Sequence, residues 1–183
     1  MTSPTTLSLW RRRWAWIVAA VIVLVWCGVT ARLFVWPPLP DLPATVDAIV
    51  ELGGPGERDD LAVALAEEGR ARYLVQSASA MEMRYNQCLP PVPHVTVVCF
   101  HPDPFSTRGE ARAIATMAAR YGWRSVILVT TRDQAWRAKV RVGRCFDGDV
   151  YVATAGLPWQ DWPYQIAYQW AATAKAFTYE RSC

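Results

Sequence analysis

The feature that most constrains the fold is a short apolar run in the second half of the chain, which ends in hydroxyl-bearing and charged residues. The run begins at Ser125 and stops at Thr130 and Thr131, after which a charged turn opens a basic helical segment that reaches Ala138. Such a run is typical of a parallel strand buried on both faces, with polar side chains at its carboxyl end. Ligands of open α/β sheets bind at that edge, so residues 130–137 are also a candidate site.

Short apolar runs alternate with helical stretches along most of the chain. The expected strands are Ala48–Leu52, Tyr73–Ser77, Val95–Phe100, Ser125–Thr130 and Val150–Ala153. The expected helices are Asp59–Glu68, Thr107–Tyr121, Ala135–Cys145 and Pro163–Tyr179. This alternation predicts an α/β, Rossmann-like domain, in which a mostly parallel sheet carries helices on both faces.

Three details of this prediction concern the first helix, a long loop and the last helix. In the first helix, Leu61, Ala64 and Leu65 are expected on one buried face. Residues 78–93, with three prolines, are expected to form a loop. The last helix is rich in aromatic residues, but polar and charged residues interrupt it, which favours packing on the sheet over a second membrane span. The interrupting residues are Gln165, Gln169, Lys175 and Glu180.

An apolar segment near the amino end predicts a transmembrane anchor. Residues 1–13 end in the cationic cluster Arg11-Arg12-Arg13, and residues 14–35 contain a single charge, Arg32. About 20 predominantly apolar residues are enough for a helix to span a bilayer. The preceding arginines predict that the amino end stays in the cytoplasm. We therefore expect single-pass anchoring in the cell membrane, with the lipid bilayer contacting residues 14–35.

Three other interpretations of this segment compete with an anchor. The lack of a polar face argues against the buried helix of a soluble protein. A cleaved signal peptide stays open, because Val29-Thr30-Ala31 offers small residues at a cleavage site, but the apolar run exceeds the usual length. A lipoprotein signal at Cys27 is excluded because Trp26 stands where a small residue is needed.

The prolines after the anchor predict an extended spacer at residues 36–46, which holds a domain off the membrane surface. Residues 47–183, about 140 in number, suit one extracytoplasmic domain with its own core. The net charge of +3 includes the arginine cluster beside the membrane. Nucleic acid is therefore not an expected partner, since no basic surface with interleaved aromatic residues is indicated.

The cysteines outside the anchor predict two disulfides in an oxidising compartment. Cys27 lies in the anchor, which leaves Cys88, Cys99, Cys145 and Cys183. Three pairings are possible. We favour Cys88–Cys99, which closes a loop, and Cys145–Cys183, which pins Cys183 to the end of a helix, while free buried thiols remain the alternative. No metal site is expected, because no CxxC spacing occurs and the two histidines flank a strand.

Polar segments are expected to converge at the carboxyl edge of the sheet. After the first strand, Gly53 and Gly54 let the backbone approach a ligand, and Arg58 could bind phosphate or carboxylate. A tight turn with a solvated arginine explains the same residues. A second segment opens a helix that Ser106 or Thr107 can cap. Thr107 and Glu110 are candidate ligand contacts, but their spacing also fits a capping box.

The third polar segment is the end of the apolar run described first. The hydroxyls of Thr130 and Thr131 and the amide of Gln134 suit recognition of a sugar, a phosphate or a nucleotide. Arg137 lies one turn into the helix and can point back at the same edge. A helix capped by Asp133, with solvated arginines, is the alternative interpretation.

The order of these motifs resembles the YdcF/SanA/ElyC family of bacterial envelope proteins. The resemblance covers about residues 47–152 and rests on the glycine-rich turn with its arginine, on Ser-Thr-x-Gly-Glu-Ala and on Val-Thr-Thr followed by Arg-Ala. It implies a Rossmann-like fold and a role in envelope or peptidoglycan homeostasis, without a defined reaction. The matching residues are Gly53, Gly54, Arg58, Thr107, Glu110, Thr130, Thr131, Arg137 and Ala138.

The chain departs from this family at two positions. Ser77 is followed by Ala78-Ser79-Ala80, where family members often have a Ser-Gly-Gly turn, and Ser77 is a further candidate ligand contact. Gln134 stands where family members often have a histidine. Because an amide does not titrate, Gln134 cannot act as a general base.

These observations leave three functions open. The favoured one is a binding protein at the outer face of the membrane, with an anionic ligand of the phosphate, nucleotide or lipid-linked sugar type, such as a cell-wall intermediate. The second is an enzyme acting on a phosphate- or sugar-containing envelope substrate, with Glu110 as acid or base and with Arg58 and Arg137 stabilising charge. The third is a structural partner of another envelope protein. The sequence identifies no cofactor.

Overall fold

Five parallel strands form the centre of the domain, in the order β3-β2-β1-β4-β5. The computed structural model describes residues 4–85 and 87–183, with side chains from Trp10 onward. The strands are β1 (Ala48–Glu51), β2 (Tyr73–Ser77), β3 (Thr96–Phe100), β4 (Ser125–Thr131) and β5 (Asp149–Ala155). The strand order reverses between β1 and β4, as in doubly wound sheets. The expected Rossmann-like α/β fold is confirmed.

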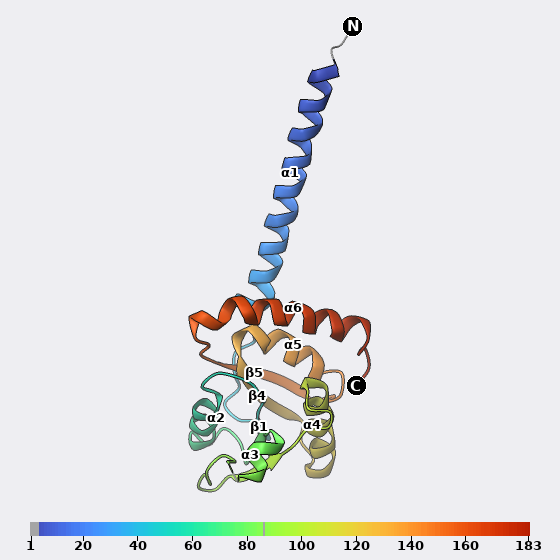
Figure 1. The fold of residues 1–183 in the computed structure, drawn as a ribbon. Helices are drawn as coiled ribbons and strands as arrows, with labels where there is room; N and C mark the ends of the chain where they lie inside the picture. The colour runs from blue at the N-terminus through green and yellow to red at the C-terminus, as the bar shows by residue number, and fades with distance from the viewer. Residues whose placement is uncertain (1–3, 86) are drawn as a thin grey trace.

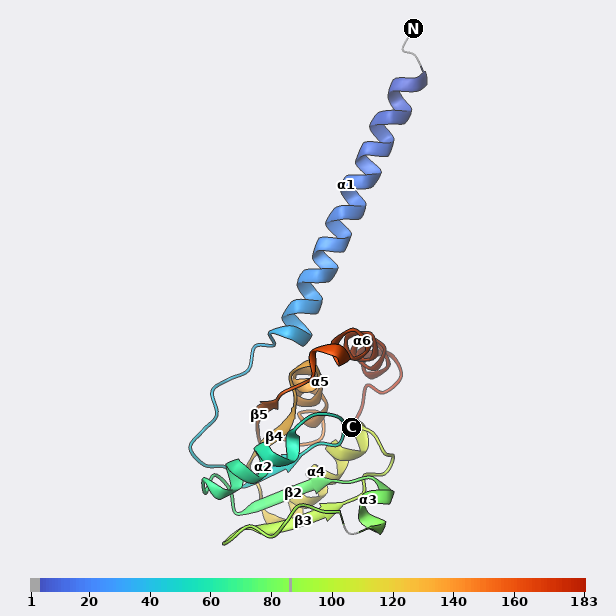
Figure 2. The ribbon, with the colours of Figure 1, turned by 60° about the vertical axis from the view of Figure 1, so that its left-hand side comes forward.

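Helices cover both faces of this sheet (Figures 1 and 2). They are α2 (Arg58–Glu67), α3 (Ala80–Arg84), α4 (Thr107–Tyr121), α5 (Arg132–Val142) and α6 (Trp162–Thr178), with the 3-10 turn η2 (Trp159–Asp161) before α6. Side chains of a strand alternate between its two faces. Val50 and Leu128 therefore pack with α4 and α5, whereas Ile49 and Ile127 pack with α2.

The structure corrects the expected helices in three places. A short helix, α3, lies inside the expected loop, because Ser79 and Glu82 form a capping box that starts it. Helix α5 begins at Arg132 rather than Ala135, directly after β4. In α2 the buried side chains belong to Ala62, Leu65 and Ala66, and Ala64 of the expected face is exposed. The buried face of α2 thus includes Arg58 at the start of the helix.

An apolar helix projects away from the domain (Figure 1). It comprises α1 (Pro4–Thr30) and the π-helical turn η1 (Ala31–Val35). Within it, Trp10–Val35 is the one segment of the described residues that is long and apolar enough to cross a membrane. Most of its side chains from Trp10 onward touch no other part of the protein and are exposed.

Helix α6 packs on α5 and on the base of α1 rather than on the sheet, so the expected packing of the last helix is wrong. The indole of Trp170 stacks on Trp26 with 6.2 Å between ring centroids and meets Phe34 edge-on at 5.5 Å. Its Nε1 donates a hydrogen bond to Thr30 Oγ1 at 3.1 Å. The layer of helices above α5 thus links the domain to the projecting helix.

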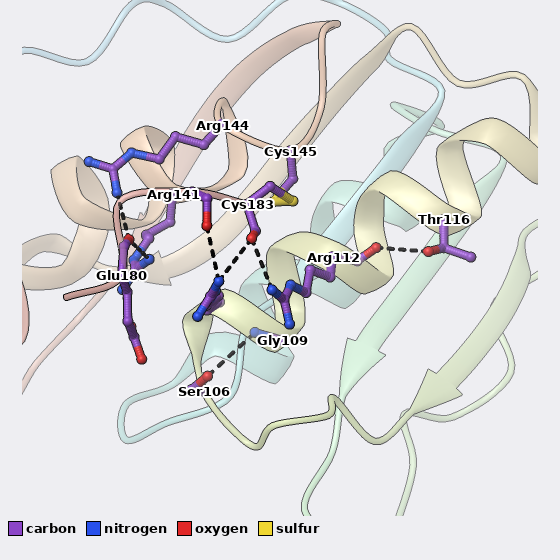
Figure 3. Close-up of a disulfide and its surroundings, with 11 residues drawn as sticks. Ser106, Gly109, Arg112, Thr116, Arg141, Arg144, Cys145, Glu180 and Cys183 are labelled. Carbon is purple, nitrogen blue, oxygen red and sulfur yellow. Dashed lines mark hydrogen bonds and ion pairs between the residues drawn. A yellow bond between two sulfur atoms is a disulfide. The ribbon is translucent and has the colours of Figure 1, made fainter. Parts of the chain in front are cut away.

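Two disulfides join the cysteines in the favoured pairing, Cys88 with Cys99 and Cys145 with Cys183. The second bond ties the segment after α6 to the end of α5 (Figure 3). Arg112 of α4 adds a hydrogen bond of 2.9 Å to the main-chain oxygen of Cys183. The polypeptide after α6 is therefore fixed to both helices that cover one face of the sheet.

Loss of the Cys145–Cys183 bond should destabilise the domain. The bond spans 38 residues, so the combined Cys145→Ser and Cys183→Ser change should lower the free energy of unfolding by about 2–4 kcal/mol, chiefly by freeing the unfolded chain. Urea unfolding of the purified full chain measures this difference. Cys27→Ser is the control, because Cys27 is exposed and unpaired in the structure. Equal unfolding midpoints for the double variant and the control would contradict the expectation.

Candidate functional site

A cavity of about 480 Å³ opens at the carboxyl edge of the sheet, next to the point where the strand order reverses. Its walls come from the turn after β1, the start of α4, the first turns of α5 and the first half of α6. The lining residues are Gly53, Gly54, Pro55, Phe105, Ser106, Thr107, Glu110, Gln134, Arg137, Tyr164, Gln165, Tyr168 and Gln169. Ligands of doubly wound sheets bind at this position.

Arg58 holds the turn after β1 against the end of β4. Its side chain is 1 % exposed. Nη1 donates to the carbonyl oxygens of Leu52 and Gly53, both at 2.8 Å, and Nη2 donates to Thr131 Oγ1 at 3.0 Å and Gln134 Oε1 at 3.2 Å. Both terminal nitrogens thus bond to protein acceptors, so the structure has a buried clamp where the sequence left a choice between a ligand contact and a solvated arginine.

Close approach and backbone conformation require a glycine at position 54. Gly54 has φ +137°, and a Cβ there would come within 2.9 Å of the Arg58 guanidinium. Side chains rarely tolerate that backbone conformation. Gly53 donates its N–H to Glu110 Oε1 at 2.8 Å. The turn therefore brings main-chain atoms to the wall of the cavity.

Glu110 takes a tertiary role rather than a place in a capping box. Ser106 is the N-cap of α4 and its hydroxyl accepts from the N–H of Gly109, while the Glu110 carboxylate reaches across to Gly53. The expected cap at Ser106 is thus confirmed, and the capping box of Thr107 and Glu110 is wrong. Burial raises the pKa of Glu110, and the Ser77 side chain and the Gly53 N–H, which act in the opposite direction, offset this effect only in part.

A chain of hydrogen bonds connects α4, α5 and α6 behind the cavity wall. Thr107 Oγ1 accepts from Arg137 Nη1 at 3.1 Å and from Gln134 Nε2 at 3.4 Å. Gln169 of α6 accepts from Arg137 Nε at 2.7 Å and donates to Asp133 Oδ2 at 2.8 Å. Asp133 does not cap α5, because the N-cap of this helix is Thr131. The Asp133 side chain is instead 1 % exposed and belongs to the network.

Arg137 is the basic side chain that faces the cavity. It is 6 % exposed, and its guanidinium lies 6.0 Å from the ring centroid of Tyr168. Nε and Nη1 bond to protein acceptors, and Nη2 bonds to no acceptor among the described residues. Burial lowers the pKa of Arg137, but a guanidinium stays protonated at neutral pH. The cavity therefore contains a fixed positive charge with one donor group left over.

The other candidate residues lie outside this cavity. Thr131 is buried and accepts from Arg58. Thr130 is buried within the sheet, and its hydroxyl has no hydrogen-bond partner among the described residues. Ser77 is also buried and lines a different cavity, on the side of α2 and α3. The structure thus brings Gly53, Gly54, Thr107, Glu110, Gln134 and Arg137 together around one space.

Sequence reasoning missed the contribution of α6. Tyr164, Tyr168 and Gln169 line the cavity, and Gln169 is 1 % exposed. The only signal in the sequence is the pair of glutamines, Gln165 and Gln169, in an otherwise apolar and aromatic helix. A buried glutamine needs hydrogen-bond partners, so a glutamine on the packed side of this helix is a signal for a polar site.

Glu51, at the end of β1, was missed as well. It lines the second cavity, of about 520 Å³, and is 4 % exposed. Its Oε2 has no hydrogen-bond partner among the described residues. Burial, helped by the negative charge of Asp59, raises the pKa of Glu51 to about 9. The carboxyl is therefore protonated at neutral pH in the folded protein.

The raised pKa of Glu51 should make the stability of the domain fall as the pH rises. Between the ordinary pKa of 4.5 and about 9, the folded state holds a proton that the unfolded chain has lost, so the free energy of unfolding decreases by up to about 1.4 kcal/mol per pH unit. Glu51→Gln should remove the part of this slope that Glu51 contributes, whereas the raised pKa of Glu110 leaves a residual slope of the same sign. Urea unfolding of the full chain between these pH values measures it.

Glu67→Gln is the matched control, because Glu67 is an exposed glutamate of α2. This variant should keep the slope of the unchanged protein. A Glu51→Gln protein with that same slope would show that Glu51 does not carry a shifted pKa.

Comparison of the chain with protein-family models, with curated proteins and with solved structures found no significant match. Within residues 4–85 and 87–183, no group of three or more His, Cys, Asp or Glu side chains is placed to hold a metal ion.

Proposed function

We propose that this protein is a membrane-anchored, extracytoplasmic binding protein for an anionic ligand, with a role in cell-envelope or peptidoglycan homeostasis. The observation that carries the binding proposal is the buried Arg137, which faces the cavity with Nη2 free of protein acceptors among the described residues. A phosphoryl or carboxylate oxygen is the natural partner of that group.

The surroundings of Arg137 favour an anion for two further reasons. The first turn of α4 begins at Ser106 and Thr107 in the cavity wall, and the N–H groups and dipole of a helix start attract negative charge. The raised pKa of Glu110 reduces the negative charge that its carboxyl would otherwise bring to the cavity. A phosphate, a nucleotide or a phosphate-linked sugar fits this combination of groups.

The proposed location rests on separate observations. The apolar segment Trp10–Val35 carries the arginine cluster of residues 11–13 at its amino end, which favours a cytoplasmic amino end. The two disulfides are compatible with an oxidising compartment for the domain. The resemblance to the YdcF/SanA/ElyC family adds the envelope role to this proposal.

Anion binding should depend on Arg137. In calorimetric titrations of the purified full chain with inorganic pyrophosphate, Arg137→Gln should weaken binding by roughly tenfold to a hundredfold, since a hydrogen bond to a charged group contributes about 1.5–3 kcal/mol. Arg132→Gln is the matched control, because it removes the same charge from an exposed position of the same helix. Equal affinities for the two variants would contradict the proposed site.

Glu110 supports an enzyme as the second candidate function. Its carboxyl lines the cavity, and burial raises its pKa toward the range that suits a general acid. Glu110→Gln keeps an oxygen that can accept from Gly53 but removes the proton that could be transferred. If the protein hydrolyses p-nitrophenyl phosphate, this variant should lower turnover by about a hundredfold or more while pyrophosphate affinity is retained. Equal loss of binding and turnover would contradict a catalytic Glu110.

A further inference from the structure

Helix α6 presents an exposed face that is almost free of charge. The side chains on this face recur at intervals of three and four residues, as on one side of a helix. They belong to Tyr164, Ala167, Tyr168, Ala171, Ala174 and Thr178. Lys175, the one charged residue of α6, lies on the same face. Two aromatic side chains flank the helix, Trp159 at 82 % and Tyr179 at 88 % exposure.

The opposite side of α6 accounts for its attachment to the domain. Gln169 is buried in the hydrogen-bond network with α5, and Thr173 and Ala176 are buried as well. The helix is therefore amphipathic in an unusual sense, because its polar anchor Gln169 faces the protein and its exposed face carries alanine and tyrosine. Such a face gains little from contact with water.

The projecting helix fixes where this exposed face lies. Residues 14–31 contain no charge and extend about 27 Å as a helix, at roughly 1.5 Å per residue. Trp26 and Thr30, which contact Trp170 of α6, lie in the last turns of this segment before Arg32. Helix α6 is thus at the level of the domain-side end of the apolar segment.

The direction of α6 completes the geometry. Figure 1 shows α6 running across the top of the domain while α1 rises away from the same side, and Figure 2 shows α6 end-on beside the base of α1. The sheet and α3 lie on the far side of α5 from both helices. A bilayer crossed by α1 would therefore meet α6 along its exposed face.

We infer that α6 is an interfacial helix, which lies along the outer surface of the bilayer with Ala167, Ala171 and the outer edges of Tyr164 and Tyr168 in contact with lipid; the cavity that these two tyrosines also line therefore opens next to the membrane surface. This inference rests on the proposed membrane anchoring by α1. Amphipathic helices bind at the boundary between headgroups and acyl chains through their apolar face. Tyrosine and tryptophan prefer this boundary because their rings are partly apolar and partly polar.

The bilayer fits this face better than a protein partner does. A single membrane-spanning helix holds the domain so close to the lipid that any partner on α6 would have to occupy the space between the domain and the headgroups. The residues of this face include no acidic side chain. Beyond it, Glu180 forms an ion pair of 3.0 Å with Lys175 and a second one with Arg141, and the exposed Arg181 adds a positive charge at the same end. This positive charge is complementary to an anionic membrane surface.

Lipid-borne quenchers test the contact directly. The full chain with Cys27→Ala carries no cysteine outside the two disulfides, so Ala167→Cys and Ala171→Cys each provide a single site for a fluorescent label. The labelled protein is reconstituted in vesicles of phosphatidylcholine and phosphatidylglycerol that carry nitroxide groups near the headgroups. Both labels should lose most of their fluorescence.

Ala80→Cys in the same background is the matched control, because Ala80 is an exposed alanine at the start of α3, on the side of the domain away from α6. Its label should keep its fluorescence and remain open to aqueous iodide. If the labels on α6 behave as this control does, α6 does not lie on the membrane. If they are shielded from both quenchers, a second copy of the chain or another protein covers the face, and the inference is also wrong.

A label on Cys27 of the otherwise unchanged chain separates this inference from the proposed anchoring. Cys27 is exposed on α1, so its label should be quenched by nitroxides placed along the acyl chains. Quenching at Cys27 without quenching on α6 would overturn the interfacial helix alone. No quenching at Cys27 would overturn the anchoring, and the inference with it.

Discussion

The buried guanidinium of Arg58 is the constraint on which the rest of the site depends. A charge removed from water must be matched by hydrogen-bond acceptors, or the folded state loses several kcal/mol. The acceptors come from the turn after β1, at Leu52 and Gly53, and from the region where β4 passes into α5. These two chain segments are thereby fixed against each other. The Gly53 N–H then meets Glu110, and Gln134 is oriented toward Thr107.

The sequence was informative about the fold because periodicity is a local property. The five apolar runs became the five strands, and the long helices lie where the pattern indicated. Site residues were harder to interpret, since their partners are remote. Glu110 bonds to Gly53 across 57 positions, and Arg137 bonds to Gln169 across 32. A capping box and a solvated arginine are local explanations, and such explanations fail when tertiary contacts use the same side chains.

The two buried arginines have different roles, and this difference bears on the choice between binding and catalysis. Arg58 has its terminal nitrogens occupied by the protein, so its contribution is to shape. Arg137 keeps a donor group for the cavity, where Glu110 is the titratable neighbour. An anion-binding protein requires the positive charge of Arg137. The alternative, an enzyme, requires in addition a proton that Glu110 can transfer.

Helix α6 follows all the strands in the chain, so the cavity and the contact with α1 form only after it is synthesised. A ribosome makes the strands, α4 and α5 before it makes residues 162–178. Until those residues dock, Asp133 and Arg137 lack the amide of Gln169, and the base of α1 lacks the indole of Trp170. A nascent chain interrupted before α6 would therefore contain every strand of the sheet, but its cavity would lack one wall and α1 would lack its contact with Trp170.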